Sequence, residues 1–229
     1  MNSTSILEEN PLFSELTKGE IQQLIDLSIC RSYPADQWIT HYGSDWPYLF
    51  LVEQGQLIAL KESPEGRSLV VMVLEKEDVF WGVGFFKEGM GMPVALVADQ
   101  PARLRLWSRE QLVPFLRKHG QLTWSLSQLM VERMLRASQI LEEIAFQPVA
   151  GRLAHLLLTQ FEEQTGETLT RDLTLDEMAA RIGTTREMVC RQLYKLADEG
   201  MIQINRTELK ITDLKMLKET AQLLKGGER

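Results

Sequence analysis

The side chains best suited to chemistry are four charged residues within one short stretch. Arg186, Glu187, Arg191 and Lys195 recur at spacings that place them on the outward side of a helix. A guanidinium can donate two hydrogen bonds to O6 and N7 of guanine, and a carboxylate can accept one from N4 of cytosine. The stretch therefore predicts a helix that enters the major groove with its first turns against base edges.

A helix-turn-helix pattern surrounds these residues and would position them. Thr174 and Glu177 have the spacing of a capping box at the start of a first helix. Gly183 suits the positive φ of a tight turn between two steeply crossed helices. Thr184 or Thr185 then caps the second helix. Its inward positions recur at helical spacing and are Met188, Val189, Leu193 and Leu196.

Two alternating strands follow this second helix. Residues 201–204 and 208–211 are joined by the turn 205–207, which predicts a wing with Arg206 at its tip. We expect base contacts from Arg186, Glu187 and Arg191, and phosphate contacts from Thr185, Lys195 and Arg206. The simpler alternative is a small helical packing unit with a solvated charged face. The full set of residues expected at DNA is Thr185, Arg186, Glu187, Cys190, Arg191, Lys195 and Arg206.

Composition is typical of a globular protein of one or two domains. The chain has 229 residues and a net charge of −7, which argues mildly against a protein that coats DNA. A site-specific reader remains compatible with this charge, because binding depends on a local basic face. Cys30 and Cys190 are too few and too far apart for a disulfide framework or a zinc site. Without a long apolar run or a secretory signal, we expect a cytoplasmic protein that does not contact membranes.

The first half of the sequence predicts a barrel or sandwich, and a long helix follows it. Between residues 31 and 108, short alternating runs are broken by turn residues at even spacing. Residues 121–147 then predict one helix with an apolar stripe at heptad spacing. A solitary helix packed on its own barrel is the alternative to a dimer. The stripe predicted as the dimer seam consists of Met130, Met134, Ala137, Leu141 and Ile144.

The segment EMAARIGTTREMVCRQLYKLADEGMI resembles the winged helix-turn-helix of the cAMP receptor protein/FNR (CRP/FNR) family of bacterial transcription regulators. Arg186, Glu187, Val189 and Arg191 match that family's recognition-helix pattern. The hairpin at residues 49–57 is similar to one in the family's effector domain. The resemblance extends from about residue 10 to about residue 215.

The resemblance implies an α+β fold in three parts. Residues 1–120 would form an effector-sensing double-stranded β-helix, which is a jelly-roll barrel like that of cyclic-nucleotide-binding domains. Residues 121–147 would form the dimerisation helix, and residues 148–229 a winged helix-turn-helix domain. In some members a small base-contacting residue occupies the position of Cys190.

The expected effector pocket departs from the family's cyclic-nucleotide binders. Those members carry a Glu for the ribose and an Arg for the cyclic phosphate, whereas this chain has Gly82 or Val83 and Met92-Pro93 at the matching places. A buried phosphate would then have no counter-charge. Simple core filling, an apolar or aromatic effector, and haem held by His41, His119 or His155 all stay open. An iron–sulfur cluster of four thiolates is excluded. The apolar residues at this place are Phe80, Trp81, Gly82, Phe85 and Met92.

Together these observations predict a homodimeric, sequence-specific transcription regulator that binds palindromic double-stranded DNA. Its signal would be an unknown small molecule other than a cyclic nucleotide, or none, and we expect no resident cofactor. An activator would also contact RNA polymerase through a patch that the sequence does not place. The alternative is a small-molecule or haem sensor whose helix-turn-helix serves only protein contacts. We expect no enzyme, because the segment 80–92 offers only Lys87 and Glu88 as acid–base groups.

Overall fold

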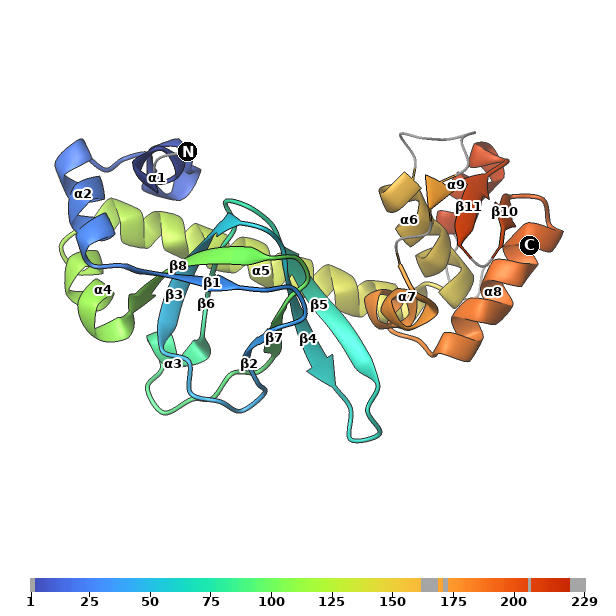
Figure 1. Cartoon of the computed structure of the whole chain (residues 1–229), viewed down its shortest axis with the longest axis horizontal. Helices are drawn as coiled ribbons and strands as arrows, with labels where there is room; N and C mark the ends of the chain where they lie inside the picture. Colours follow the sequence, from blue (N-terminus) through green and yellow to red (C-terminus); the bar gives the residue numbers. More distant parts are fainter. Residues whose placement is uncertain (1–2, 162–168, 171–172, 206, 223–229) are drawn as a thin grey trace. The chain divides into compact units, whose positions relative to one another are not determined.

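The computed structural model describes residues 3–161, 169–170, 173–205 and 207–222. The chain divides into two compact units, of which the first contains residues 1–61 and 71–136 and the second residues 62–70 and 137–229. The division falls inside the long helix α5 (Gly120–Phe146), which thus contributes to both. Figure 1 labels the elements of each unit.

Residues 29–108 form two four-stranded sheets. In both, an early strand pairs antiparallel with a late one, since β1 pairs with β8 and β2 with β7. This arrangement is that of a jelly roll and confirms the predicted double-stranded β-helix. The first sheet has the order β1 (Ile29–Tyr33), β8 (Ala102–Ser108), β3 (Tyr48–Gln54) and β6 (Val79–Trp81), and the second the order β2 (Trp38–Thr40), β7 (Ala95–Ala98), β4 (Leu57–Glu62) and β5 (Ser68–Leu74).

Apolar side chains from both sheets fill the barrel. Phe50 on β3, Leu96 on β7 and Leu104 on β8 are fully buried. Along β4, Leu57 and Ala59 are buried whereas Ile58 and Leu60 are half-buried. This alternation is the period-two signal by which the strand was predicted.

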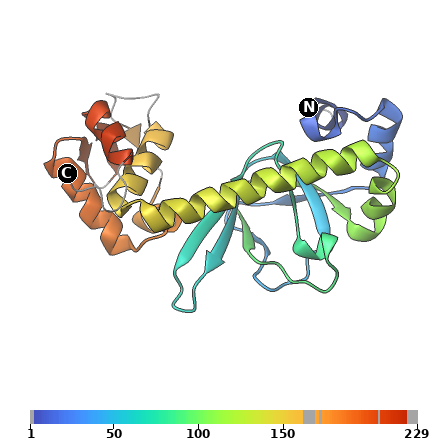
Figure 2. The same cartoon turned by 180° about the vertical axis from the view of Figure 1, so that it is seen from behind.

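Helices cover one side of the first unit and form a second core there. The elements are α1 (Ser3–Glu9), η1 (Pro11–Phe13), α2 (Lys18–Asp26), α4 (Arg109–Leu116) and the first part of α5. Trp107 of β8 is fully buried among them and donates its indole N–H to the carbonyl of Leu24 at 2.8 Å. Leu122 and Leu126 anchor α5 in the same cluster. Figure 2 shows α5 running past the strands.

The second unit is a winged helix-turn-helix. Its elements are α6 (Val149–Phe161), β9 (Leu169–Thr170), α7 (Leu175–Ile182), α8 (Arg186–Asp198), β10 (Ile202–Ile204), β11 (Glu208–Ile211) and α9 (Leu214–Ala221). Leu157 of α6, Met178 of α7, Val189 of α8 and Leu217 of α9 are fully buried in one core. The C-terminal helix α9 therefore packs within this unit, against α6.

Several short elements were not predicted from the sequence patterns, among them β6, the single-turn helix α3 (Val83–Phe86) and β9. β6 and α3 lie in the stretch that we had treated as a pocket loop. β9 extends the wing to three strands by pairing with β11. β9 has two residues and α3 is a single helical turn, so neither shows a period, and β6 is a run of three apolar residues without alternation.

Candidate nucleic-acid interface

The turn between α7 and α8 is built as predicted. Thr174 and Glu177 form the complete capping box, with each side chain bonded to the backbone N–H of the other residue. Gly183 has φ +64°, the left-handed conformation that the turn requires. The hydroxyl of Thr185, rather than Thr184, caps α8 by accepting from the Met188 N–H at 3.3 Å. These bonds fix where α8 starts.

One side of α8 is buried and the other is exposed. Val189, Leu193 and Leu196 are buried in the core of the second unit, and Met188 is half-buried. The predicted outward residues Arg186, Glu187, Arg191 and Lys195 are all exposed, whereas Cys190 is partly exposed. The helix thus presents a continuous polar face.

Tyr194 was missed in the sequence analysis and lies in the middle of this face. It is 65% exposed, and it follows Glu187 by seven residues and Arg191 by three. Residues three, four and seven apart share one side of a helix. The helical spacing alone could have identified Tyr194. Its ring and hydroxyl offer a stacking surface and a hydrogen-bonding group.

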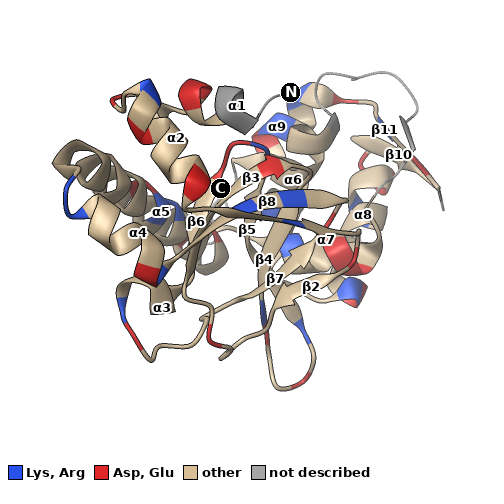
Figure 3. Cartoon of the chain, turned by 60° about the vertical axis from the view of Figure 1, so that its left-hand side comes forward, with Lys and Arg blue, Asp and Glu red and all other residues tan. Residues whose placement is uncertain are grey.

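The charged side chains of the face have partners in the free protein. Arg186 pairs with Asp176 of α7 at 2.7 Å, and both side chains are more than half exposed. Arg191 donates to the sulfur of Met188 at 2.8 Å. Lys195 lies 3.8 Å from Glu199, one turn further along α8. Figure 3 shows positive and negative residues close together on α7 and α8. Exposed pairs of this kind are weak and can exchange for DNA.

Glu187 is held in its ionised form. Its carboxylate accepts hydrogen bonds from its own backbone N–H and from the Thr185 side chain, and these lower its pKa below the ordinary value. The carboxylate therefore stays an acceptor at neutral pH. That is the state needed to accept a hydrogen bond from the N4 amino group of cytosine.

The wing has a tightly bonded turn. Asn205 Oδ1 accepts from the N–H groups of Thr207 at 2.9 Å and of Glu208 at 2.8 Å. Lys210 on β11 is half-buried. Arg206, expected at the tip, lies outside the described residues.

The residues expected at an effector pocket divide between two apolar cores. Phe80 and Met92 pack in the core between the sheets, whereas Trp81 and Phe85 belong to the helix-side core. Phe85 and Met92 are almost completely buried. At Gly82 an added Cβ would lie 1.8 Å from the Trp46 carbonyl oxygen, so only glycine fits there. Core filling, one of the alternatives left open, describes Phe85 and Met92.

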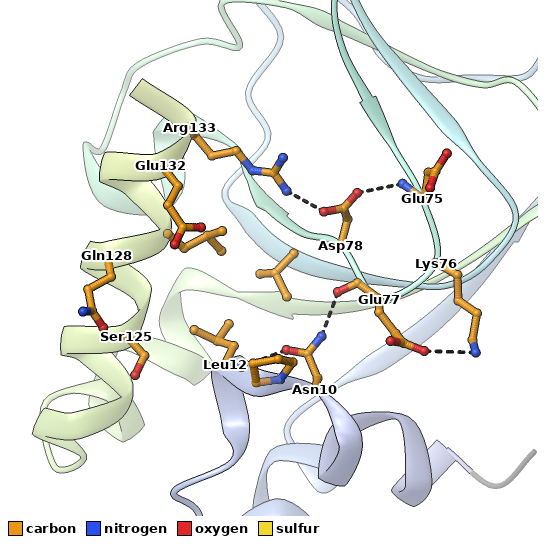
Figure 4. A pocket seen from close by; sticks show the side chains of 13 residues that line it. Asn10, Leu12, Glu75, Lys76, Glu77, Asp78, Ser125, Gln128, Glu132 and Arg133 are labelled. Carbon is orange, nitrogen blue, oxygen red and sulfur yellow. Dashed lines mark hydrogen bonds and ion pairs between the residues drawn. The ribbon is translucent and has the colours of Figure 1, made fainter. Parts of the chain in front are cut away.

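A different pocket opens elsewhere in the first unit, with a volume of about 490 Å³. It lies between the segment 10–12, the turn 75–79 and α5 (Figure 4). Asn10 donates to the Glu77 carbonyl at 2.7 Å, Arg133 pairs with Asp78 at 2.6 Å and Lys76 pairs with Glu77 at 3.0 Å. Its charged walls are therefore largely paired with one another. The sequence gives no signal for this pocket, because the three segments are far apart in the chain.

The apolar face of α5 differs in part from the predicted seam. Met134, Ala137 and Leu141 are exposed, but Met130 packs against the helix-side core and Ile144 is half-buried. Trp124 and Val131 are exposed as well. The exposed residues at heptad spacing are Trp124, Ser127, Val131, Met134, Ser138, Leu141 and Ala145.

Two of the three histidines considered for haem have other ring contacts, and His155 is exposed. His119 stacks on Phe115, and its two ring nitrogens lie 2.8 Å from the Phe115 carbonyl and 3.0 Å from the Glu20 carboxylate. The His41 ring stacks on Trp38. Within the described ranges, no group of three or more His, Cys, Asp or Glu residues is placed to hold a metal ion. None of the helices in those ranges is long and apolar enough to cross a membrane.

The fold and the interface define a transcription regulator in which a jelly-roll domain is joined through a long helix to a winged helix-turn-helix. A model of the cyclic nucleotide-binding domain matches residues 30–119, and a model of the Crp-like helix-turn-helix domain matches residues 151–220. The chain belongs to the CRP/FNR family of transcription regulators.

Individual relatives are distant but match along most of the chain. The cyclic AMP receptor protein of Thermus thermophilus is 25% identical over 215 residues, covering 94% of this chain and 98% of the relative. A Crp/Fnr-family regulator from Eubacterium rectale superposes with a TM-score of 0.80 at 23% identity, covering 93% and 98% of the two chains. The c-di-GMP responsive regulator CLP of Xanthomonas campestris has a TM-score of 0.75 at 21% identity, covering 85% and 99%. These two structures support the fold.

Proposed function

We propose that this regulator is a homodimer that reads a palindromic operator with its two copies of α8, in response to a signal other than a cyclic nucleotide. The observation that carries the proposal is the polar, exposed face of α8. This helix begins directly after the turn at Gly183. Arg186, Glu187 and Arg191 would contact base edges, and Thr185, Lys195 and Arg206 would contact phosphates. Two such helices one helical turn apart fit half-sites about ten base pairs apart.

The exposed stripe of α5 supports the homodimer. Met134 is 64% exposed and Leu141 is 69% exposed, and an apolar stripe of this size is rarely left to solvent on a monomer. Its heptad spacing suits two parallel helices. The seam we propose keeps Met134 and Leu141, with Val131 taking the place of the half-buried Met130.

The apolar filling of the barrel supports a signal other than a cyclic nucleotide. Met92 lies where the family's nucleotide binders carry the phosphate-binding arginine, and it is buried among apolar neighbours. A phosphate placed there would lose its hydration without gaining a counter-charge. We therefore expect that millimolar cyclic AMP or cyclic GMP leaves the affinity for DNA unchanged.

Selection of bound duplexes from a random pool, with and without cell extract, tests the function. A palindromic consensus whose affinity falls steeply with salt supports specific binding through phosphates and bases. Recovery of random sequence, or binding without salt dependence, contradicts it. Titration of the selected duplex in the presence of each cyclic nucleotide tests the signal, and a clear rise in affinity would refute that part of the proposal.

A further inference from the structure

A buried arginine joins two helix ends in the second unit. Arg152, near the start of α6, is only 8% exposed. Its Nε donates to the carbonyl of Ile182 at 2.7 Å. Its Nη1 donates to the carbonyl of Gln147 at 2.6 Å and lies 3.4 Å from that of Glu143. One guanidinium therefore binds the end of α5 and the end of α7 at the same time.

The acceptors explain how a buried cation is accommodated. Glu143 is in the last turn of α5, Gln147 follows that helix directly, and Ile182 is the last residue of α7. Carbonyls at helix C-termini carry the negative end of the helix dipole, and most of them lack intrahelical donors. The Glu143 carbonyl also accepts from the Gln147 N–H at 2.9 Å, so its contact with Arg152 is a second one. Burial lowers the pKa of Arg152, and the charge on Glu143 partly opposes this. The planar guanidinium can serve several acceptors at once, which an ammonium cannot do in the same geometry.

The bond to Ile182 lies directly before the turn that starts α8. Gly183 and Thr184 both donate their backbone N–H groups to the carbonyl of Ala179, and Thr185 caps α8. The direction of α8 relative to α7 is therefore fixed by the turn. Arg152 of α6 donates both to the last residue of α7 and to the Gln147 carbonyl directly after α5. These bonds in turn fix the recognition helix relative to the end of α5.

We propose that Arg152 is a positioning residue that sets the direction of α8 relative to the end of α5, and thereby the half-site spacing that the dimer accepts. The inference rests on the proposed function, because spacing has meaning only for a dimer on a palindrome. Adding one base pair between half-sites moves them by about 3.4 Å and rotates them by about 35°. A rigid junction rejects such a change, whereas a loosened junction tolerates it.

Reading of a single half-site does not depend on this junction. Leu153 and Leu157 of α6 pack with Val189 and Leu193 of α8 in the same apolar core. That core keeps the helix-turn-helix folded when the guanidinium is removed. Loss of Arg152 should therefore affect the choice of spacing and leave the choice of bases unchanged.

The test compares Arg152→Gln and Arg152→Lys with wild type in the full-length chain. Duplexes carry two copies of the selected half-site at the best spacing and at spacings one or two base pairs shorter or longer. Wild type should lose at least about tenfold in affinity away from the best spacing, the cost of about one mismatched base pair. Arg152→Gln should lose less than about threefold, and Arg152→Lys should lie between. Preference for the correct base at each half-site position should stay as in wild type.

Arg117→Gln is the matched control, since it removes an exposed guanidinium from the first unit and should behave as wild type. Thermal unfolding and sedimentation establish that each variant is a folded dimer. If Arg152→Gln is not folded, the affinities at the different spacings are compared between Arg152→Lys, which keeps the positive charge, and wild type. A folded variant that is as selective for spacing as wild type overturns the inference alone. A wild-type chain that binds no DNA, or binds equally at every spacing, overturns the proposed dimeric reader and this inference with it.

Discussion

Each charged side chain on the exposed face of α8 already has a contact in the free protein. Arg186 pairs with Asp176, Arg191 reaches the sulfur of Met188, and Lys195 lies near Glu199. These contacts hold the side chains in defined positions at little energetic cost, because exposed pairs are worth roughly 0–1 kcal/mol. DNA therefore binds a partly ordered surface, and replacing these contacts by contacts with DNA costs little free energy.

Replacing Arg191 by Ala tests its assignment as a base reader. The variant should bind its operator more weakly by about 1–3 kcal/mol and should lose preference at one base pair of each half-site. Fluorescence anisotropy with the operator and with single-base variants measures both effects. Arg117→Ala removes an exposed arginine from the first unit and should change neither. Full retention of base preference by Arg191→Ala would show that this residue does not read sequence.

Asp176 offers a change in the opposite direction. Its carboxylate pairs with Arg186 and would lie near the DNA phosphates, so Asp176→Asn should free Arg186 and remove a repulsion. We expect a gain in affinity of up to about fivefold, which corresponds to a surface pair of about 1 kcal/mol. Glu110→Gln, an equal change of charge at an exposed position of α4, should have no effect. Weaker binding by Asp176→Asn would contradict the competition we infer.

At the scale of the element, α8 depends on its N-terminal cap. The Thr185 hydroxyl accepts from the Met188 N–H, which would otherwise have no partner in the helix. Thr185→Ala should lower the free energy of unfolding by about 1 kcal/mol, whereas Thr185→Ser should keep most of the stability. Urea unfolding followed by circular dichroism measures both variants. If Thr185→Ala is as stable as Thr185→Ser, the cap is not important for the helix.

Elements with a clear period were predictable, and those without one were not. The α7–α8 pair was predicted from its capping box, its glycine and its apolar spacing, all of which act locally. Phe85 is different, because its burial against the helices depends on α3, a single turn that no periodicity could reveal. Tyr194 obeys the helical spacing of the exposed face and could have been predicted from it. Met130 shows the limit of a heptad pattern, since its neighbours decide whether an apolar residue meets solvent or the core.

At the scale of the whole molecule, the dimer can be tested through α5. Leu141→Glu places a charge in the exposed apolar stripe, and burying it unpaired against a second helix would be costly. Sedimentation at micromolar concentration should show a dimer for wild type and a folded monomer for the variant. The variant should also lose most of its affinity for the palindrome. Gln121→Glu adds the same charge to α5 away from the stripe and should remain a dimer.

A dimeric variant of Leu141→Glu, or a monomeric wild type, would contradict the proposed seam. A monomeric variant that still bound the palindrome as tightly as wild type would show instead that DNA binding does not require dimerisation. The composition of the chain could not have predicted either the dimer or the binding of DNA. The net charge of −7 is a sum over the whole chain, whereas each of these interactions depends on one local surface.

The two cysteines are natural labelling sites with which the binding of DNA to α8 can be followed. Cys190 lies partly exposed on α8, and Cys30 is exposed on β1 in the other unit. Both are free thiols, so a maleimide dye should label both in the absence of DNA. Bound operator should shield Cys190 and leave Cys30 as an internal reference within the same chain. The ratio of the two labelling rates would then report, without any engineered probe, what fraction of recognition helices is seated in a groove.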